Sequence, residues 1–171
     1  MRIGLFSIAM IAASISASAF AQSASGSGSI TVLRPLTVTK NADLRFGTVV
    51  RPTTGSGTAV ISNAGVRSVT GGVAGLASGT TPGAAQFTLA GEGGQSVSVT
   101  VPATFNILNS TETLVITTTN DMAGSAGAQL LSGALGTAGS LVVNVGGSVP
   151  ITSTTATGLY TGTFTVSAAY N

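Results

Sequence analysis

The chain has 171 residues, only 6% of them charged, and a formal net charge of +2 at pH 7. Its Lys and Arg residues occur singly, so we expect no nucleic-acid surface, which needs grouped cations to neutralise phosphates. The absence of histidine and cysteine rules out Ser-His and Cys-His nucleophile pairs and the usual zinc ligands. We therefore expect no enzymatic activity, no cofactor and no metal site. A glycosidase pair formed by two of the four carboxylates is the remaining catalytic alternative.

The first 21 residues have the pattern of a secretory signal peptide. Arg2 precedes an apolar run of mostly small residues that extends to about Ala19, and Ala19-Phe20-Ala21 is a small-x-small cleavage site. The run is too short and too interrupted by serines for a transmembrane helix, and no later segment approaches the ~18 apolar residues that such a helix needs. We expect a secreted protein that crosses the periplasm to the cell surface, not an integral membrane protein, with a mature chain starting at Gln22.

The segment after the cleavage site divides into a flexible part and a strand. Residues 22–28 read Gln-Ser-Ala-Ser-Gly-Ser-Gly, which predicts a flexible segment without a large apolar side chain. Residues 29–39 then alternate between apolar and polar, which predicts a β-strand with one apolar face. Pro35 cannot donate a ladder hydrogen bond, so this strand lies at a sheet edge or is interrupted there. The apolar face of this N-terminal strand consists of Ile30, Val32, Leu36 and Val38.

The middle of the chain is predicted as short strands separated by turns. The strand-like segments before residue 120 are 44–50, 58–62, 85–89, 95–101, 105–107 and 112–119. Residues 63–83 are predicted to form one short strand and a long loop. The turn residues 91–94 predict a hairpin between the strands at 85–89 and 95–101. Residues 121–139 are predicted as a loop that packs Leu130, Leu131 and Leu135, and strands follow at 141–145 and 149–151.

The last predicted strand runs from residue 158 to residue 170. Its even positions are mostly apolar and its odd positions are mostly Thr or Ser, so one face is expected to be buried. The residues that define this assembly-strand candidate are Gly158, Tyr160, Gly162, Phe164, Val166 and Tyr170. Tyr170 is predicted either to dock a partner or to fill the core. The two glycines are either sites of close backbone approach or ordinary strand-start and bulge glycines.

Eight or nine short strands with closely spaced turns, and no helix, predict an all-β sandwich. Three segments resemble a family of uncharacterised, secreted, pilin-like bacterial proteins known only as a domain of unknown function. They are PLTVTKNADLRFGTVV at 35–50, AQFTLAGEGG at 85–94 and GLYTGTFTV at 158–166. Gly158 and the penultimate Tyr170 also resemble the C-terminal strand of chaperone–usher pilins. The resemblance implies an immunoglobulin-like Greek-key sandwich over residues 29–171, among fimbrial or spore-coat-type proteins.

The resemblance also implies a function. Chaperone–usher pilins lack one core strand and receive it from a neighbour. We therefore expect a non-enzymatic structural subunit of a surface filament (fimbria) or coat, which self-associates and has a periplasmic chaperone and usher as partners. Residues 22–28 carry no apolar side chain to fill a groove, and residues 30–38 are either the subunit's own first strand or a donated one. The alternative is a secreted, self-complete sandwich that binds carbohydrate or another surface ligand.

Overall fold

The structure is a computed structural model that describes residues 22–122 and 128–171. These residues form β-strands and no helix, which confirms the all-β prediction, and they therefore include no apolar helix long enough to cross a membrane. The chain divides into two units, Met1–Thr31 and Val32–Asn171. Residues 22–31 of the first unit contain no strand. The predicted signal peptide and its cleavage site lie outside the described residues.

Twelve strands occur in the described ranges, more than the eight or nine expected, because several are only two to four residues long. They are β1 Thr37–Ala42, β2 Val49–Val50, β3 Ser56–Ile61, β4 Arg67–Thr70, β5 Ala74–Gly75, β6 Ala85–Glu92, β7 Ser96–Thr100, β8 Thr104–Leu108, β9 Thr113–Asn120, β10 Ala128–Leu130, β11 Ala138–Thr152 and β12 Ser167–Tyr170.

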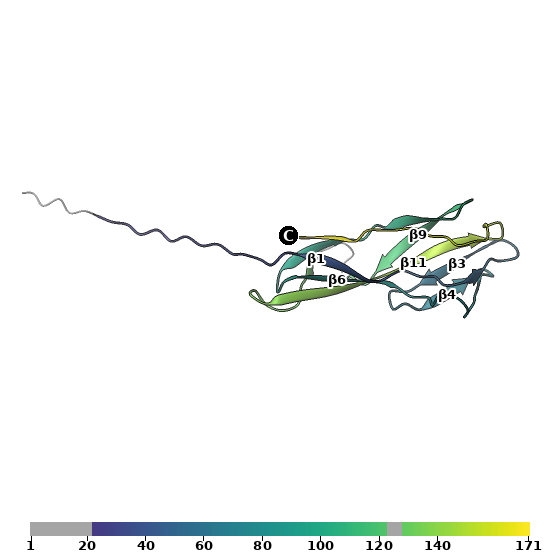
Figure 1. Ribbon diagram of the computed structural model, residues 1–171, viewed down its shortest axis with the longest axis horizontal. Helices are drawn as coiled ribbons and strands as arrows, with labels where there is room; N and C mark the ends of the chain where they lie inside the picture. Colours follow the sequence, from purple (N-terminus) through teal and green to yellow (C-terminus); the bar gives the residue numbers. More distant parts are fainter. Residues whose placement is uncertain (1–21, 123–127) are drawn as a thin grey trace, which may run out of the picture. The chain divides into compact units, whose positions relative to one another are not determined.

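The longest strand, β11, organises the larger sheet, whose order is β1-β6-β11-β3-β4 (Figure 1). Residues 138–145 of β11 pair with β6, residues 147–152 pair with β3, and residues 145–148 pair with β9, which in turn pairs with β8. A second sheet has the order β10-β7-β12, and β2 pairs with β5. All of these pairings are antiparallel, so the sheets are built without crossover helices.

Two glycines allow three strands to meet at the middle of β11. A Cβ atom on Gly146 would lie 2.4 Å from the carbonyl oxygen of Ile61, and one on Gly147 would lie 3.0 Å from Ile116 Cγ2. The backbone approaches so closely here that any side chain would displace a neighbour. Glycine at these positions therefore lets β11 pass from β6 to β3 while it also contacts β9.

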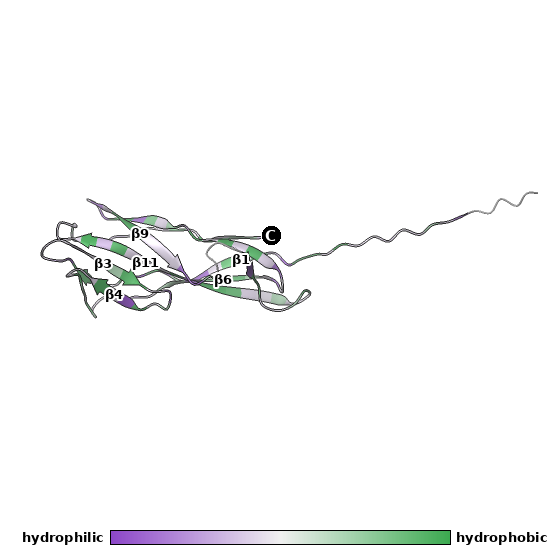
Figure 2. Cartoon of the chain, turned by 180° about the vertical axis from the view of Figure 1, so that it is seen from behind, coloured by the Kyte–Doolittle hydropathy of each residue, from purple (hydrophilic) through white to green (hydrophobic). Residues whose placement is uncertain are grey.

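The two larger sheets pack face to face, as a sandwich requires. A first core cluster joins Leu89 and Val143 of the larger sheet to Val97 and Val99 of the second sheet, all essentially inaccessible to solvent. Figure 2 shows hydrophobic and hydrophilic bands along the strands, as expected where one face is buried. In a second cluster the partly buried members outnumber the buried ones, whereas the reverse holds in the first. The buried members of the second cluster are Ala59, Val73, Ile116, Val149 and Ile151.

The predicted N-terminal strand over 29–39 is wrong in its position. The ladder with β6 begins only at Thr37 and continues to Ala42. Ile30 and Val32 are 87% and 78% exposed, so the two halves of the predicted apolar face separate. The physical reason is that Pro35 has no N–H to donate and that the N–H of Arg34 bonds to a carboxylate rather than to a strand.

The remaining β-rich segments also differ from the sequence-based expectation in their pairing. β6 and β7 do not form the predicted hairpin but lie in different sheets. The turn between them bonds elsewhere, because Gly93 donates its N–H to Thr137 O at 2.9 Å and Gly94 donates to Leu131 O at 3.2 Å. The strands expected at 141–145 and 149–151 are one continuous strand, β11. The predicted loop at 121–139 contains β10 and buries Leu131, whereas Leu130 and Leu135 are exposed.

Candidate functional site

The C-terminal segment 158–170 is paired at its two ends and unpaired between them. Thr161 exchanges two backbone hydrogen bonds with Leu108, at 2.8 and 2.9 Å, and β12 pairs with β7 from Ser167 to Tyr170. No backbone hydrogen bond joins residues 162–166 to another described residue. The sequence predicted one continuous strand, and the structure corrects this to a short bridge, an unpaired stretch and the strand β12.

The side-chain alternation predicted for this segment persists through the unpaired stretch. Val166 is buried in the first core cluster, and Phe164 is half-buried against it. The Phe164 ring lies 5.8 Å from the Phe87 ring in an edge-on arrangement and 4.7 Å from the Phe105 ring. Three threonines of the segment are exposed on the other face: Thr161, Thr163 and Thr165. Side-chain packing therefore holds the segment extended without a hydrogen-bonding partner strand.

One edge of this segment is open. In an antiparallel pair, a residue that exchanges both hydrogen bonds points its N–H and C=O at its partner, and the residues on either side point theirs away. Thr161 bonds to β8 in this way, and Asn171 donates its N–H to Ser96 O next to β7 at 3.1 Å. The backbone groups of the even residues 160–166 therefore face away from β8 and β7. We call these groups the open edge.

An apolar groove of about 900 Å³ separates residues 155–164, which include most of the open edge, from residues 42–51. Residues of the second core cluster form its apolar lining, which explains why that cluster is less completely buried than the first. The apolar side chains that line the groove include Leu44, Phe46, Phe105, Ile107, Leu114, Ile116, Val149 and Ile151. The groove thus exposes part of the sandwich core between two chain segments that do not pair with each other.

Polar contacts fix the wall of the groove that carries Tyr160. The Tyr160 hydroxyl lies 2.9 Å from the Glu112 carboxylate and 2.8 Å from the Ala156 carbonyl oxygen, and Ala156 donates its N–H to Glu112 at 2.7 Å. Burial, followed by the hydrogen bond to Glu112, raises the pKa of Tyr160. Arg51 donates to Thr155 O at 2.6 Å and so joins the two walls. Contacts within the chain therefore hold the groove walls in place.

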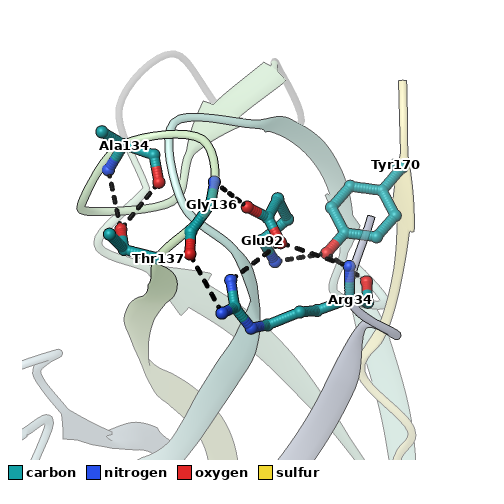
Figure 3. A network of polar contacts seen from close by, with 6 residues as sticks. All are labelled: Arg34, Glu92, Ala134, Gly136, Thr137 and Tyr170. Atoms are coloured by element: carbon teal, nitrogen blue, oxygen red, sulfur yellow. Dashed lines mark hydrogen bonds and ion pairs between the residues drawn. The ribbon is translucent and has the colours of Figure 1, made fainter. Parts of the chain in front are cut away.

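A second polar network lies around Glu92, Arg34 and Tyr170 (Figure 3). The Arg34 side chain donates to Glu92 at 2.9 Å and to Gly136 O at 3.1 Å. The Tyr170 hydroxyl donates to Arg34 O at 3.0 Å and accepts from the N–H of Glu92 at 2.6 Å. The N–H of Gly136 also donates to the Glu92 carboxylate. We call this network the Arg34 clamp, because it fixes Arg34 to both β6 and β12.

The clamp stabilises the charged form of Glu92. Glu92 is 2% exposed, yet its carboxylate accepts bonds from the Gly136 N–H and from Arg34. The Gly136 hydrogen bond is the largest effect that lowers the pKa of Glu92 below its ordinary value; burial opposes it, and Arg34 lowers it further. The carboxylate is therefore ionised at neutral pH inside a nearly closed site.

The structure brings together some of the residues singled out in the sequence and separates others. Tyr170 and Leu36 pack against the same core cluster, whereas Ile30 and Val32 are exposed and Val38 is 36% exposed. The remaining assembly-strand residues, Tyr160, Gly158, Gly162 and Phe164, line the groove.

Glycine occurs at positions 158 and 162 of the assembly strand for different structural reasons. A Cβ on Gly162 would lie 2.1 Å from Asn106 O, so close backbone approach requires glycine there. Gly158 instead has a φ of +145°, a conformation that L side chains rarely adopt.

Sequence reasoning did not find Arg34, Glu92 and Glu112, which organise the two networks. The feature of the sequence that could have pointed to Glu92 and Glu112 is the scarcity of acidic residues. The whole chain has only four of them, and these two are the carboxylates at the centres of the networks. Within residues 22–122 and 128–171, no three potential metal-ligating side chains lie together. What the site offers is therefore an apolar groove and an unpaired backbone edge.

Comparison with known proteins places most of the chain in a family. Residues 36–170 match the domain of unknown function DUF4402. The chain belongs to this family. The DUF4402 match includes every strand from β1 to β12, the groove and Tyr170, and it leaves residues 22–35 outside. No curated protein and no solved structure matches the chain. Membership of an uncharacterised family is thus confirmed, and the comparisons give no support to the pilin part of the resemblance.

Proposed function

We propose that this DUF4402 protein is a non-enzymatic structural subunit of a bacterial surface filament or coat, and that its groove receives one β-strand from a partner. The observation that carries the proposal is the unpaired stretch 162–166 beside an apolar groove over the second core cluster. A strand placed there would pair with the backbone of the open edge and insert alternate side chains into the groove.

The chemistry of the groove favours a strand over a small ligand. Exposed strand edges readily accept another strand, because a row of N–H and C=O groups lacks partners. A second extended backbone matches the regular spacing of such a row, and pockets for alternate side chains give specificity. Each large apolar side chain that becomes buried there contributes about 1.5–3 kcal/mol. Two or three such side chains would add about 3–9 kcal/mol to the backbone hydrogen bonds of the inserted strand, which offsets part of the cost of association.

The alternative, a self-complete sandwich that binds carbohydrate, has less support in the structure. Carbohydrate sites of that kind need exposed aromatic rings. In the described part of the chain every aromatic side chain is buried or half-buried. The Phe164 ring packs against both Phe87 and Phe105. The proposal includes secretion through the predicted signal peptide, and a periplasmic chaperone and usher as transient partners that cover the same open edge before assembly.

Hydrogen–deuterium exchange tests the proposal directly. Purified monomer and assembled protein are compared by mass spectrometry, with electron microscopy to show the assemblies. We expect the amides of the open edge, those of Tyr160, Gly162, Phe164 and Val166, to exchange fast in the monomer and at least about tenfold more slowly after assembly, because they gain hydrogen-bonding partners. The amide of Thr161, which already bonds to Leu108 O, and the amides of β11 serve as controls and should exchange alike in both states. Assemblies in which the open-edge amides exchange as fast as in the monomer would refute the use of the groove.

A further inference from the structure

We propose that the strand that fills the groove carries an acidic side chain that pairs with Arg51, and that it comes from a protein other than a second copy of this chain. This inference rests on the proposed function and adds the chemistry of the partner. It starts from the charges of the groove. Of the described residues, four charged ones line it, and two of these, Lys40 and Asp43, form an ion pair at 2.6 Å. The other two are Arg45 and Arg51, so the groove has an excess of positive charge.

Arg51 lies at one end of the open edge. Its guanidinium donates to Thr155 O at 2.6 Å. The next residue, Ala156, accepts the hydrogen bond of the Tyr160 hydroxyl at 2.8 Å. Arg51 is therefore nearer the Tyr160 end of the open edge than the Val166 end. A strand that pairs with the open edge would approach Arg51 with one of its two ends, its last residues if it runs antiparallel and its first residues if it runs parallel.

The Arg51 guanidinium has no carboxylate partner within the part of the chain that the structure describes. No carboxylate oxygen there lies within 4.0 Å of it, and Thr155 O is the acceptor that it uses. A guanidinium has five N–H donors, and the exposed position of Arg51 leaves the remaining ones to solvent. An inserted strand would exclude solvent from this side chain, which is unfavourable for a charge that gains no partner. A carboxylate on the strand removes this cost, because it accepts two parallel N–H bonds from one guanidinium.

A second copy of this chain has no free acidic side chain to offer. The four acidic residues of the chain all bond within the fold: Asp43, Glu92, Glu112 and Asp121. Glu92 and Glu112 hold the two polar networks, and Asp121 accepts the backbone and side-chain N–H groups of Asn144 at 2.8 and 2.6 Å. Asp43 lines the groove itself. A strand that carried any of these residues would first have to leave its own sandwich, so we assign the inserted strand to a different protein.

Peptides that differ only in their charged side chains test this assignment. The probe is the acetylated and amidated peptide Glu-Thr-Val-Thr-Val-Thr-Val-Thr-Glu. Its valines and both carboxylates share one face, and either strand direction brings one carboxylate to Arg51. Gln or Lys replaces both Glu residues in two comparison peptides. We expect the Glu peptide to bind at least about tenfold more tightly than the Gln peptide, and the Lys peptide to bind most weakly. Fluorescence anisotropy measures the dissociation constants, and slower exchange of the open-edge amides shows that the peptide lies in the groove.

Two protein variants separate direct pairing from the general positive charge of the groove. Arg51→Gln removes the proposed partner, so the preference for Glu over Gln should fall below about twofold. Arg45→Gln is the matched control. It removes the same charge from the same wall, but the Arg45 guanidinium lies against residues 81–83, so the preference should stay within about threefold of its original value. Because each preference compares two peptides on one variant, a looser groove wall affects both measurements alike. Arg51→Glu should reverse the preference in favour of the Lys peptide.

The possible outcomes distinguish this inference from the function on which it rests. Equal binding of the Glu and Gln peptides to the unchanged protein, or equal loss of preference in Arg51→Gln and Arg45→Gln, overturns the pairing and leaves the strand-receiving function standing. Assemblies of the purified chain alone with protected open-edge amides would identify a second copy as the partner and overturn the assignment to a different protein. If no peptide slows exchange of the open-edge amides, both proposals fail. Protection by decanoate in that case would identify the groove as a site for an anionic amphiphile.

Discussion

The hydroxyl of Tyr170 donates a hydrogen bond to the backbone oxygen of Arg34, 136 positions earlier in the sequence, at 3.0 Å. The same hydroxyl accepts the N–H of Glu92. A residue that the sequence offered as either a docking group or a core filler thus joins the end of β12 to the segment before β1. It packs against the first core cluster and also makes polar contacts.

Tyr170→Phe should destabilise the domain by about 1–3 kcal/mol, because it leaves the N–H of Glu92 and the carbonyl of Arg34 without the hydroxyl while the ring stays in place. Urea unfolding followed by circular dichroism measures this change. Tyr170→Ala is the comparison and should cost more, about 2–4 kcal/mol, since the ring is also lost. Unfolding of Tyr170→Phe at the same urea concentration as the unchanged protein would contradict this role of the hydroxyl.

Acid should weaken the domain through Glu92. The pKa of this carboxyl is lowered in the folded protein, chiefly by the hydrogen bond from Gly136. Its contribution is therefore complete above the ordinary value of 4.5 and is lost as the pH falls below that value toward the folded pKa. Melting temperatures measured from pH 7 to pH 3 should fall more steeply for the unchanged protein than for Glu92→Gln.

Asp43→Asn is the control for that experiment. Asp43 pairs with Lys40 at 2.6 Å on the surface, with both side chains more than half exposed. The hydrogen bond and the charge of Lys40 also lower the pKa of Asp43. Solvent screens this exposed pair, however, so it contributes little to stability. Asp43→Asn should leave the pH profile close to that of the unchanged protein. A profile for Glu92→Gln that runs parallel to the unchanged protein would show that Glu92 does not carry the effect.

Gly146→Ala should destabilise the fold, by about 1–3 kcal/mol or more, because the new methyl group would collide with the carbonyl of Ile61. Thermal unfolding reports the loss. Gly28→Ala makes the same chemical change where a Cβ would have no atom within 4 Å, and it should leave the melting temperature unchanged. Equal stability of the two variants would mean that β11 can separate from β3 without cost.

Glu112→Gln should loosen the groove wall. Glu112 accepts the N–H of Ala156 and contacts the Tyr160 hydroxyl, so a neutral side chain weakens both contacts. We expect faster amide exchange in residues 156–160 with little change in β11. Thr163→Ser, an exposed change on the same segment, is the control. Unchanged exchange in Glu112→Gln would assign the rigidity of this wall to apolar packing alone.

The fold class and the inward face of the C-terminal segment were predictable from period-two alternation, which survives whether or not a strand has a partner. Phe164 and Val166 point inward where the pattern placed them. The strand pairing of this segment was not predictable, because side-chain alternation does not show which backbone N–H and C=O groups have hydrogen-bonding partners. Only the structure shows that Thr161 bonds to β8 and that β12 bonds to β7, and that residues 162–166 between them have no backbone partner.

The predicted position of the N-terminal strand was wrong for a related reason. Ile30, Val32, Leu36 and Val38 share one parity, and that parity continues across Pro35 even though the ladder does not. The break depends on Arg34, whose bonds to Glu92 and Tyr170 join positions far apart in sequence. The sequence did show that Arg34 and Glu92 are among the few charged residues of the chain. The scarcity of charged residues can draw attention to each of them, but it does not show that they bond to each other.

The Arg34 clamp has a mechanical consequence. A chain pulled by its N-terminal segment transmits the tension to Arg34 before any strand of the sandwich carries load. Arg34 passes that tension to the end of β6 through Glu92 and to the end of β12 through Tyr170. The force is thus shared between both sheets, because β6 and β12 belong to different ones. Peeling β1 from the edge of its sheet, one hydrogen bond at a time, would require breaking this joint first.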